Sequence, residues 1–266
     1  MKMKLICIAF VTLVCVRGVI AQDKTPFVQH SCVKAAPGQI AGISEMLPDI
    51  SRNAEVEVHE GRLAFHAVLR TTLPVGSAAR CDFMFVRGYE GYPPAPFTRA
   101  DAEANFVKSG AAGTYDDYLA RQRKLWTPVS NDLLFVPRNG IVGSGGSVGD
   151  YVRLNLDKLK PGHLVSHWAR FEREGWGAYV EAAAKDLPGL GWREEALVSP
   201  MSVDYNVMTV DILPSWAATE GDWGGSEVWN QVHPEMKNAE YMAKVREIVD
   251  PYKVELYRVV TLVVQK

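Results

Sequence analysis

The sequence predicts an α+β fold made of two tandem βαββαβ repeats, and three observations lead to this prediction. Residues that open the first copy recur 124 positions later (151 − 27 = 124): Phe27, Val28, Lys34, Pro37 and Gly38 return as Tyr151, Val152, Lys158, Pro161 and Gly162. Residues that close it recur at 241 − 118 = 123: Tyr118, Arg123, Pro128 and Leu133 return as Tyr241, Arg246, Pro251 and Leu256. Between these sets, both copies read as strand, helix, strand, strand, helix, strand. Self-similarity on this scale indicates two copies of one domain-sized unit.

The elements of the first copy follow from apolar periodicity and turn residues. Residues 27–33 are rich in apolar side chains and predict a strand, and the Pro37-Gly38 turn behind it suits the start of a helix. Apolar residues spaced three and four apart from Ile40 onward predict that helix. Further strands are predicted at 62–71, 81–87 and 133–136, and a second helix at 114–126 with Thr114 as its N-cap.

The second copy is predicted to follow the same course. Its strands are expected at 151–157, 192–198, 205–212 and 254–264, and its helices from Gly162 and at 238–249. The copies differ most between third strand and second helix, where a Gly/Pro-rich loop (89–112) in the first corresponds to a loop with three tryptophans (213–237) in the second.

The connector between the copies is rich in glycine and serine. Residues 139–149 hold five glycines and two serines without secondary-structure periodicity, which is typical of a flexible linker. A phosphate-binding loop would need a motif that these residues lack. The expected domains are therefore a first repeat at 22–138, a linker at 139–150 and a second repeat at 151–266.

The amino terminus has the pattern of a secretory signal peptide over residues 1–21. Lys2 and Lys4 precede an apolar run from Leu5 to Val16, and small residues stand before Gln22. Cleavage there predicts a secreted or periplasmic protein with no membrane attachment afterwards; an uncleaved membrane anchor is the alternative.

Composition and charge are those of an ordinary globular protein, with 47% hydrophobic and 23% charged residues. Loss of Lys2, Lys4 and Arg17 with the signal would change the formal charge from −2 to −5. An acidic chain without clustered Lys and Arg is not expected to bind nucleic acid.

Two cysteines, Cys32 and Cys81, remain in the mature chain. In an oxidising compartment two cysteines often pair, and two buried free thiols are the alternative.

The element order, together with Lys34, Pro37 and Gly38 in one copy and Lys158, Pro161 and Gly162 in the other, resembles the dimeric α/β-barrel superfamily of ferredoxin-like domains. Within it, the chain is most similar to modules of the antibiotic-biosynthesis monooxygenase, NIPSNAP and EthD type. The resemblance implies two antiparallel sheets that face each other around a pocket. Here both would belong to one chain, so we expect a monomer with an intramolecular, pseudo-dimeric barrel.

The same resemblance bears on the cysteines. It places the end of the first strand beside the start of the third, and hence Cys32 beside Cys81, within the distance that a disulfide requires. We therefore expect a Cys32–Cys81 disulfide.

The candidate site residues come from strand alternation. Val28, His30 and Cys32 match Val152, Leu154 and Leu156, an apolar set expected to lie under the helices. Gln29 and Ser31 match Arg153 and Asn155, so these polar side chains are expected to point between the sheets and to line a ligand cavity. A satisfied polar network, or a mistaken assignment of the faces, is the alternative.

A catalytic hypothesis can be added to that cavity. If the faces turn inward, His66 could act as a base and Arg153 could hold an anionic oxygen, while Asn155 or Tyr257 orients the substrate. Trp216 and Trp223 could cover the pocket or stack on a ligand, or they could plug the barrel end.

Metal and haem sites have less support. His163 and His167 share one helical face, but no third ligand follows, so a surface or packed pair is expected and no metal. Haem-binding members of the superfamily, the chlorite dismutases and dye-decolorising peroxidases, use a helix histidine, which makes haem an alternative although no cofactor is expected.

The sequence thus predicts binding of a small apolar or aromatic molecule between the sheets, with cofactor-independent monooxygenase-like oxidation as its catalytic form. The alternatives are a haem-dependent peroxidase-like or chlorite-dismutase-like activity, and a non-catalytic binding or scaffold protein if side chains fill the interior.

Overall fold

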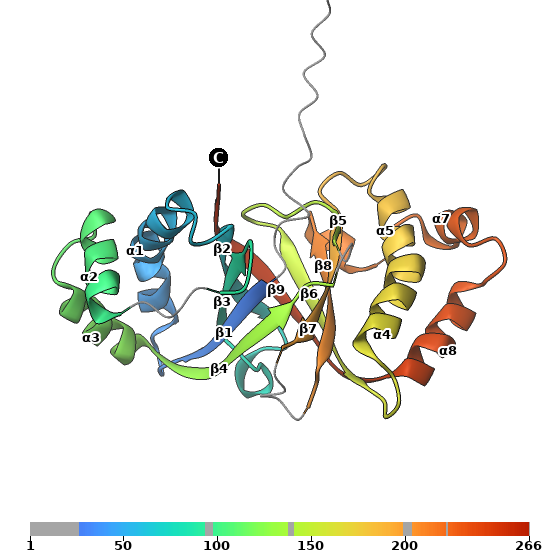
Figure 1. Ribbon diagram of the computed structural model, residues 1–266, viewed down its shortest axis with the longest axis horizontal. Helices are drawn as coiled ribbons and strands as arrows, with labels where there is room; N and C mark the ends of the chain where they lie inside the picture. The colour runs from blue at the N-terminus through green and yellow to red at the C-terminus, as the bar shows by residue number, and fades with distance from the viewer. Residues whose placement is uncertain (1–26, 94–97, 138–140, 199–203, 222, 266) are drawn as a thin grey trace, which may run out of the picture.

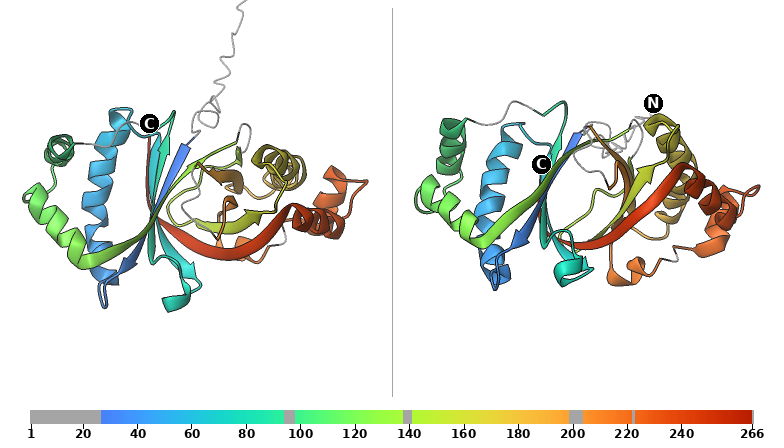
Figure 2. Two further views of the ribbon diagram at one scale, coloured as in Figure 1. Left: turned by 60° about the horizontal axis from the view of Figure 1, so that its bottom comes forward. Right: turned by 90° about the horizontal axis from the view of Figure 1, so that it is seen from below.

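A computed structural model describes residues 27–93, 98–137, 141–198, 204–221 and 223–265. A barrel of antiparallel strands stands at the centre, and helices cover it on two opposite sides (Figure 1 and Figure 2). The strand order is β4-β1-β3-β2-β9-β6-β8-β7-β5, and β4 also pairs with β7, so eight strands close into a barrel while β5 lies outside it. The predicted signal peptide at 1–21 and residues 139–140 of the predicted linker lie outside the described residues.

The strands fall into two groups with the same order. The first half holds β1 (Phe27–Ala35), β2 (Phe65–Leu73), β3 (Phe83–Tyr89) and β4 (Trp126–Phe135); the second holds β6 (Tyr151–Leu159), β7 (Gly191–Leu197), β8 (Val207–Leu213) and β9 (Val249–Val264). In each half the first strand lies between the fourth and the third, as β4-β1-β3-β2 and as β9-β6-β8-β7. The antiparallel α+β barrel expected from the sequence is therefore present, while the duplication itself stays a prediction.

The predicted helices occur where the sequence shows a long apolar helical period. In the first half α1 (Ile40–His59) and α3 (Tyr115–Leu125) occur as predicted, and a capping box between Thr114 and Asp117 begins α3. In the second half they are α4 (Val165–Glu172), α5 (Ala178–Ala183) and α8 (Asn238–Ile248). A π-helical turn (Arg173–Gly177) joins α4 to α5. Within this turn a Cβ at Gly175 would lie 2.1 Å from the Tyr241 ring, so only glycine allows this close approach.

Three α-helices were not predicted. The Gly/Pro-rich loop contains α2 (Arg99–Lys108), and the tryptophan loop contains α6 (Trp216–Thr219) and α7 (Gly225–Val232). The predicted linker is not free along its length, because β5 (Ile141–Gly143) pairs with β7.

Side chains fill the barrel interior, and this corrects the predicted strand faces. Val28 and Cys32 pack there with Val152, Leu154 and Leu156, in one cluster with residues of β2, β3, β8 and β9. A hollow of about 40 Å³ at this cluster is lined mostly by apolar side chains. The predicted faces are therefore reversed: the apolar set packs between the two facing sheets, and the polar set of Gln29, Ser31, Arg153 and Asn155 faces the helices.

The helix layers of the two halves are packed differently. In the second half, large aromatic side chains fill the space between sheet and helices: Trp168, Trp176, Tyr179, Trp192, Trp223, Trp229 and Tyr241. In the first half, α1 packs through Ile43, Met46 and Ile50 on Val68 and Phe83. The sheet surface over β1 and β4 is left more open.

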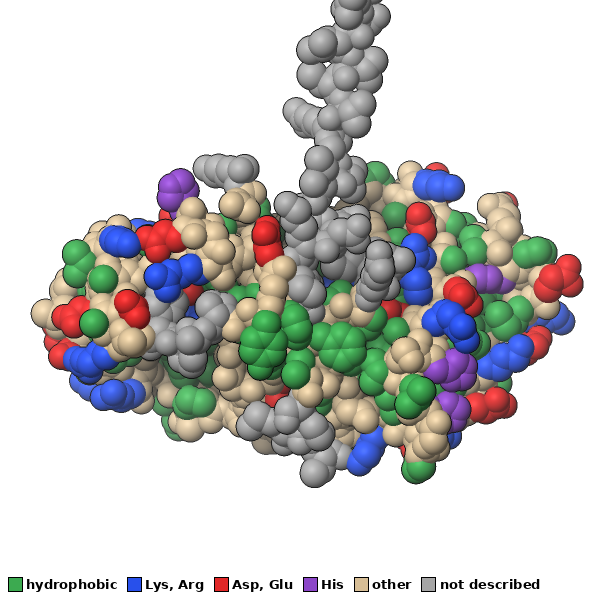
Figure 3. Space-filling model, in the orientation of Figure 1, with side chains coloured by type: hydrophobic (Ala, Val, Ile, Leu, Met, Phe, Trp, Pro, Cys, Tyr) green, Lys and Arg blue, Asp and Glu red, His purple; other side chains and the backbone are tan. Residues whose placement is uncertain are grey.

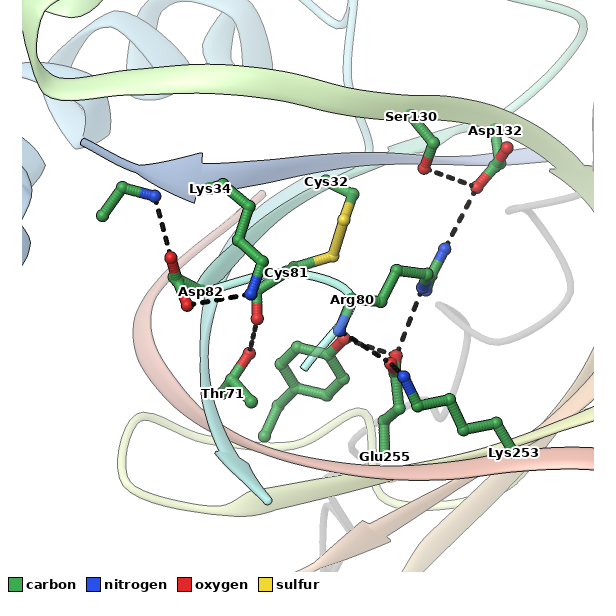
Figure 4. Close-up of a disulfide and its surroundings, with 12 residues drawn as sticks. Cys32, Lys34, Thr71, Arg80, Cys81, Asp82, Ser130, Asp132, Lys253 and Glu255 are labelled. Carbon is green, nitrogen blue, oxygen red and sulfur yellow. Dashed lines mark hydrogen bonds and ion pairs between the residues drawn. A yellow bond between two sulfur atoms is a disulfide. The ribbon is translucent and has the colours of Figure 1, made fainter. Parts of the chain in front are cut away.

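The predicted disulfide is present. Cys32 on β1 and Cys81, just before β3, are bonded with their Cα atoms 5.3 Å apart (Figure 4). Both side chains are fully buried in the barrel interior.

A buried polar cluster lies in the barrel beside the disulfide and joins the two halves. The Arg80 guanidinium lies between two carboxylates, 3.3 Å from Asp132 and 3.3 Å from Glu255 (Figure 4). Tyr205 donates a hydrogen bond of 2.8 Å to Asp132, and Tyr257 donates one of 2.6 Å to Glu255. Burial alone would raise the pKa of Glu255, but Arg80, Tyr257 and Lys253 together lower it. Arg80 and Asp132 belong to the first half and Glu255 to the second, so this cluster ties the halves together.

Buried carboxyls under the second helix layer predict a stability that falls as pH rises. Burial raises the pKa of Glu172 to about 7, despite a 2.8 Å hydrogen bond from Tyr241. A raised pKa favours the folded state below the ordinary value of 4.5, and this contribution is lost as pH rises through 7. A shift of that size corresponds to about 3 kcal/mol.

We therefore expect Glu172→Gln, which keeps an acceptor for Tyr241, to raise the free energy of unfolding at pH 8 by up to about 3 kcal/mol. At pH 4.5 it should leave that free energy nearly unchanged. Urea denaturation at both pH values measures the effect, with Glu227→Gln on the exposed face of α7 as control. Equal gains at both pH values would contradict the titration argument.

On the face seen in Figure 3, side chains of both charge signs are interspersed over the two ends of the molecule. Among the described residues, no helix is both long and apolar enough to cross a membrane.

Candidate ligand-binding site

A large hollow lies on the outside of the first-half sheet, between the sheet and helices α1 and α3. It consists of two overlapping spaces of about 500 and about 430 Å³ that share Gln29, Asn53, Glu57, Arg87, Tyr118 and Gln122. We call this continuous space the first-half groove. Its volume is in the range typical of small-molecule sites.

Strand and helix periods place the lining residues. On β3 the alternate residues Phe85 and Arg87 line the floor, as Gln29 and Ser31 do on β1. On α1, Asn53 and Glu57 are four residues apart and therefore lie on one helical face, which forms one wall. Tyr118 and Gln122 of α3, again four apart, form the other.

Charged groups in the groove are paired with one another. Arg87 lies 3.9 Å from Glu57, and Arg62 lies 3.4 Å from Glu60 at the rim. Burial raises the pKa of Glu57, while Arg87 and Arg62 counteract this rise. Burial also raises the pKa of Tyr118 to about 12, which keeps its hydroxyl protonated.

His66 lies at the groove and is 3% exposed. Burial, with a smaller contribution from Arg87, lowers its pKa to about 3, so the imidazole is neutral. Its Nδ1 is buried and has no hydrogen-bond partner among the described residues. A histidine with so low a pKa is a weak general base and is better suited to hydrogen bonding.

Other polar groups of the groove are held by hydrogen bonds. Tyr89 donates to Oε1 of Gln29 at 2.8 Å, and Ser31 donates to Oδ1 of Asn131 at 2.7 Å. Asn105 of α2 donates from Nδ2 to the Asn53 carbonyl at 3.2 Å, but its Oδ1 is buried and finds no donor among the described residues.

The structure separates the residues that were predicted to form one site. Gln29, Ser31 and His66 line the first-half groove, on the outer face of the sheet and not between the sheets. Arg153 and Asn155 lie under the helix layer of the second half, where both bond Asp211, at 2.8 and 3.0 Å. His66 and Arg153 are thus not brought together.

The remaining predicted residues lie elsewhere again. Tyr257 is in the barrel interior and bonds Glu255, while Trp223 is buried under Arg153 in the second helix layer. Trp216 is 47% exposed and makes a T-shaped contact with Tyr151, with ring centroids 5.6 Å apart. Trp223 therefore belongs to the packing of the second helix layer, whereas Trp216 lies at the surface.

His163 and His167 form a surface pair. Their rings are stacked with centroids 6.0 Å apart, and His167 is exposed. The side of α4 that faces the sheet carries Trp168 instead, so a haem held by a helix histidine between α4 and the sheet does not fit the residues present.

Sequence reasoning missed several groove residues, notably Glu57, Arg87, Asn105, Tyr118 and Gln122. The sequence of α1 does contain a signal for its two groove residues, Asn53 and Glu57. These polar residues extend the helical face that carries the apolar residues Ile43, Met46 and Ile50. Polar residues at positions where a packed helix would carry apolar ones indicate an unfilled space.

Comparisons with known proteins show the fold. No protein-family model and no curated protein matches this chain. A structure from Lactobacillus acidophilus NCFM, provisionally described as a monooxygenase, is similar with a TM-score of 0.55 and 11% identity over 91% of this chain and 97% of that one. A second protein so described, from Fusobacterium nucleatum, has a TM-score of 0.52 and 8% identity over 90% and 94% of the two chains. A third, provisionally described as a chlorite dismutase, has a TM-score of 0.49 and 10% identity over 89% and 95%. At such identities the likeness to the first two establishes a shared α/β-barrel fold, and no activity follows from it.

Proposed function

We propose that this protein binds a small molecule in the first-half groove. The observation that carries the proposal is the difference between two helix layers on sheets of the same strand order. Aromatic side chains fill the second layer, whereas the first contains a hollow of about 500 Å³. A folded protein gains stability by filling such space, so an unfilled and polar one is better explained by a ligand than by the needs of the fold.

The proposal includes an origin for this difference. Duplication of one βαββαβ unit would produce two equivalent helix layers. One layer could then become a solid core that supports the barrel, while the other keeps a ligand-binding site. The matched strand orders and the sequence echoes support this history.

Oxidation without a cofactor is the second candidate function. It is favoured by a neutral histidine in the groove and by the two similar structures provisionally described as monooxygenases. Binding ranks first because His66, with a pKa of about 3, would remove a substrate proton inefficiently at neutral pH. Oxygen consumption with a bound ligand distinguishes the two.

Export is also part of the proposal. It rests on the signal-like residues 1–21 and on the Cys32–Cys81 disulfide, which persists in oxidising compartments. Protein from the periplasm or medium should begin at Gln22 by mass spectrometry.

The binding proposal is tested by screening a small-metabolite library with ¹⁵N-resolved NMR. We expect the hits to shift backbone amides of β1, β3 and α3. Gln122→Trp should abolish these shifts because the new side chain fills the groove, whereas Gln231→Trp on the exposed face of α7 should retain them. A library without hits, or hits that bind Gln122→Trp as they bind the wild type, would overturn the proposal.

A further inference from the structure

We propose that the ligand of the first-half groove is a neutral saccharide, a disaccharide or short oligosaccharide whose ring stacks on the aromatic residues of the groove. This inference rests on the proposed function and names its ligand class.

Buried polar atoms without partners are the first argument. Nδ1 of His66 and Oδ1 of Asn105 both lie at the groove, in side chains that are 3% and 7% exposed, and neither has a partner among the described residues. Both atoms are already shielded from water, so each is a buried polar group whose lost hydration is not compensated. An apolar ligand leaves that cost in place, whereas a ligand hydroxyl group that reaches these atoms removes it.

The groove offers donors as well as acceptors. The Oε1 atom of Gln29 accepts a hydrogen bond from Tyr89, which leaves the side-chain amide nitrogen of Gln29 available as a donor. Ser31 likewise donates to Oδ1 of Asn131, which leaves the amide nitrogen of Asn131 available. Asn105 offers an acceptor, and a neutral His66 has one donor and one acceptor nitrogen. Hydroxyl groups both donate and accept, so they match a mixed set of this kind better than carbonyl or carboxylate groups, which only accept.

Aromatic surface lies beside these polar groups. Phe85 and Trp126 contact one another on the sheet side of the groove, with ring centroids 5.6 Å apart, and Tyr118 lies on the α3 side. A pyranose ring has C–H groups on its faces and hydroxyls around its edge, so it can stack on an aromatic ring while its edge makes hydrogen bonds.

The charges favour a neutral ligand. Each guanidinium of the groove has a carboxylate neighbour, Glu57 for Arg87 and Glu60 for Arg62. An anionic ligand would have to compete with these carboxylates, whereas a hydroxyl group can bridge a guanidinium and a carboxylate together.

The test is calorimetric titration with disaccharides based on glucose, galactose and N-acetylglucosamine, and with 1-naphthol and benzoate as aromatic and anionic probes. We expect at least one disaccharide to bind and both other probes to fail. Gln29→Leu and Trp126→Leu should each weaken that disaccharide tenfold or more. Gln231→Leu and Trp216→Leu, matched substitutions outside the groove, should leave its Kd unchanged.

The outcomes separate the two proposals. Binding of 1-naphthol or benzoate alone, blocked by Gln122→Trp, would overturn the saccharide inference and leave the groove as a binding site. Disaccharide binding that Gln29→Leu and Trp126→Leu leave unchanged would also overturn it. If no disaccharide binds, the saccharide inference fails. If the metabolite library yields no groove ligand either, both proposals fail.

Discussion

Replacing Cys32 and Cys81 with alanine is expected to lower the free energy of unfolding by about 4 kcal/mol. The disulfide closes a loop with a sequence separation of 49 residues, and its loss restores that loop's freedom to the unfolded chain. Urea denaturation of the oxidised wild type and of the double variant measures the difference.

Two controls separate the crosslink from the packing of its side chains. Cys32→Ala alone should lose as much as the double variant, because either substitution removes the bond. The reduced wild type should be destabilised by a similar amount, since it keeps both sulfur atoms in the barrel interior. A reduced wild type as stable as the oxidised protein would contradict the prediction.

Arg80→Met is expected to cost roughly 3–5 kcal/mol, because it leaves two buried carboxylates without their shared cation. Asp132 and Glu255 are 3% and 1% exposed, so solvent cannot replace the guanidinium. The pKa of Glu255, now lowered by Arg80 among others, should rise in the variant. Its stability should therefore improve relative to the wild type as pH falls and the carboxyl becomes protonated.

Arg99→Met is the matched control. Arg99 also pairs with an aspartate, Asp116, but both side chains are largely exposed, so its loss should leave the unfolding midpoint unchanged. Adding Glu255→Gln to Arg80→Met should recover part of the lost stability, since one of the two buried carboxylates that lost Arg80 is then neutral and no longer depends on Lys253 alone. If Arg80→Met were as stable as the wild type at every pH, the cluster of Arg80, Asp132 and Glu255 would not tie the halves together.

Long periodic segments and short-range contacts could be predicted from the sequence. The apolar spacing from Ile40 predicted α1, and Thr114 with its neighbours predicted the start of α3. The disulfide depended only on which strands are neighbours, and the resemblance supplied that order.

The faces of the strands could not be predicted. Alternation in β1 separates Val28 from Gln29 but does not say which set is covered by helices. We expected the apolar set under the helices, yet in a closed barrel the two inner faces pack against each other and need the most apolar side chains. The polar set then faces the helices, and in the first half it lines the groove.

Arg153 shows the same limit for a single residue. An arginine on a strand beside a predicted cavity suggested anion binding, but Asp211 on the neighbouring strand β8 pairs with it. Such a partner depends on register across strands distant in the sequence, which local pattern does not reveal.

The two seams that close the barrel are unequal. Along β2 and β9 the register runs from Phe65 opposite Val264 to Leu73 opposite Leu256, whereas β4 and β7 share two pairs, Leu134 with Leu197 and Phe135 with Ala196. Backbone hydrogen bonds therefore hold one side of the cylinder far more strongly than the other. If the halves separate in a thermal fluctuation, we expect the short seam to part first and the long one to act as the hinge.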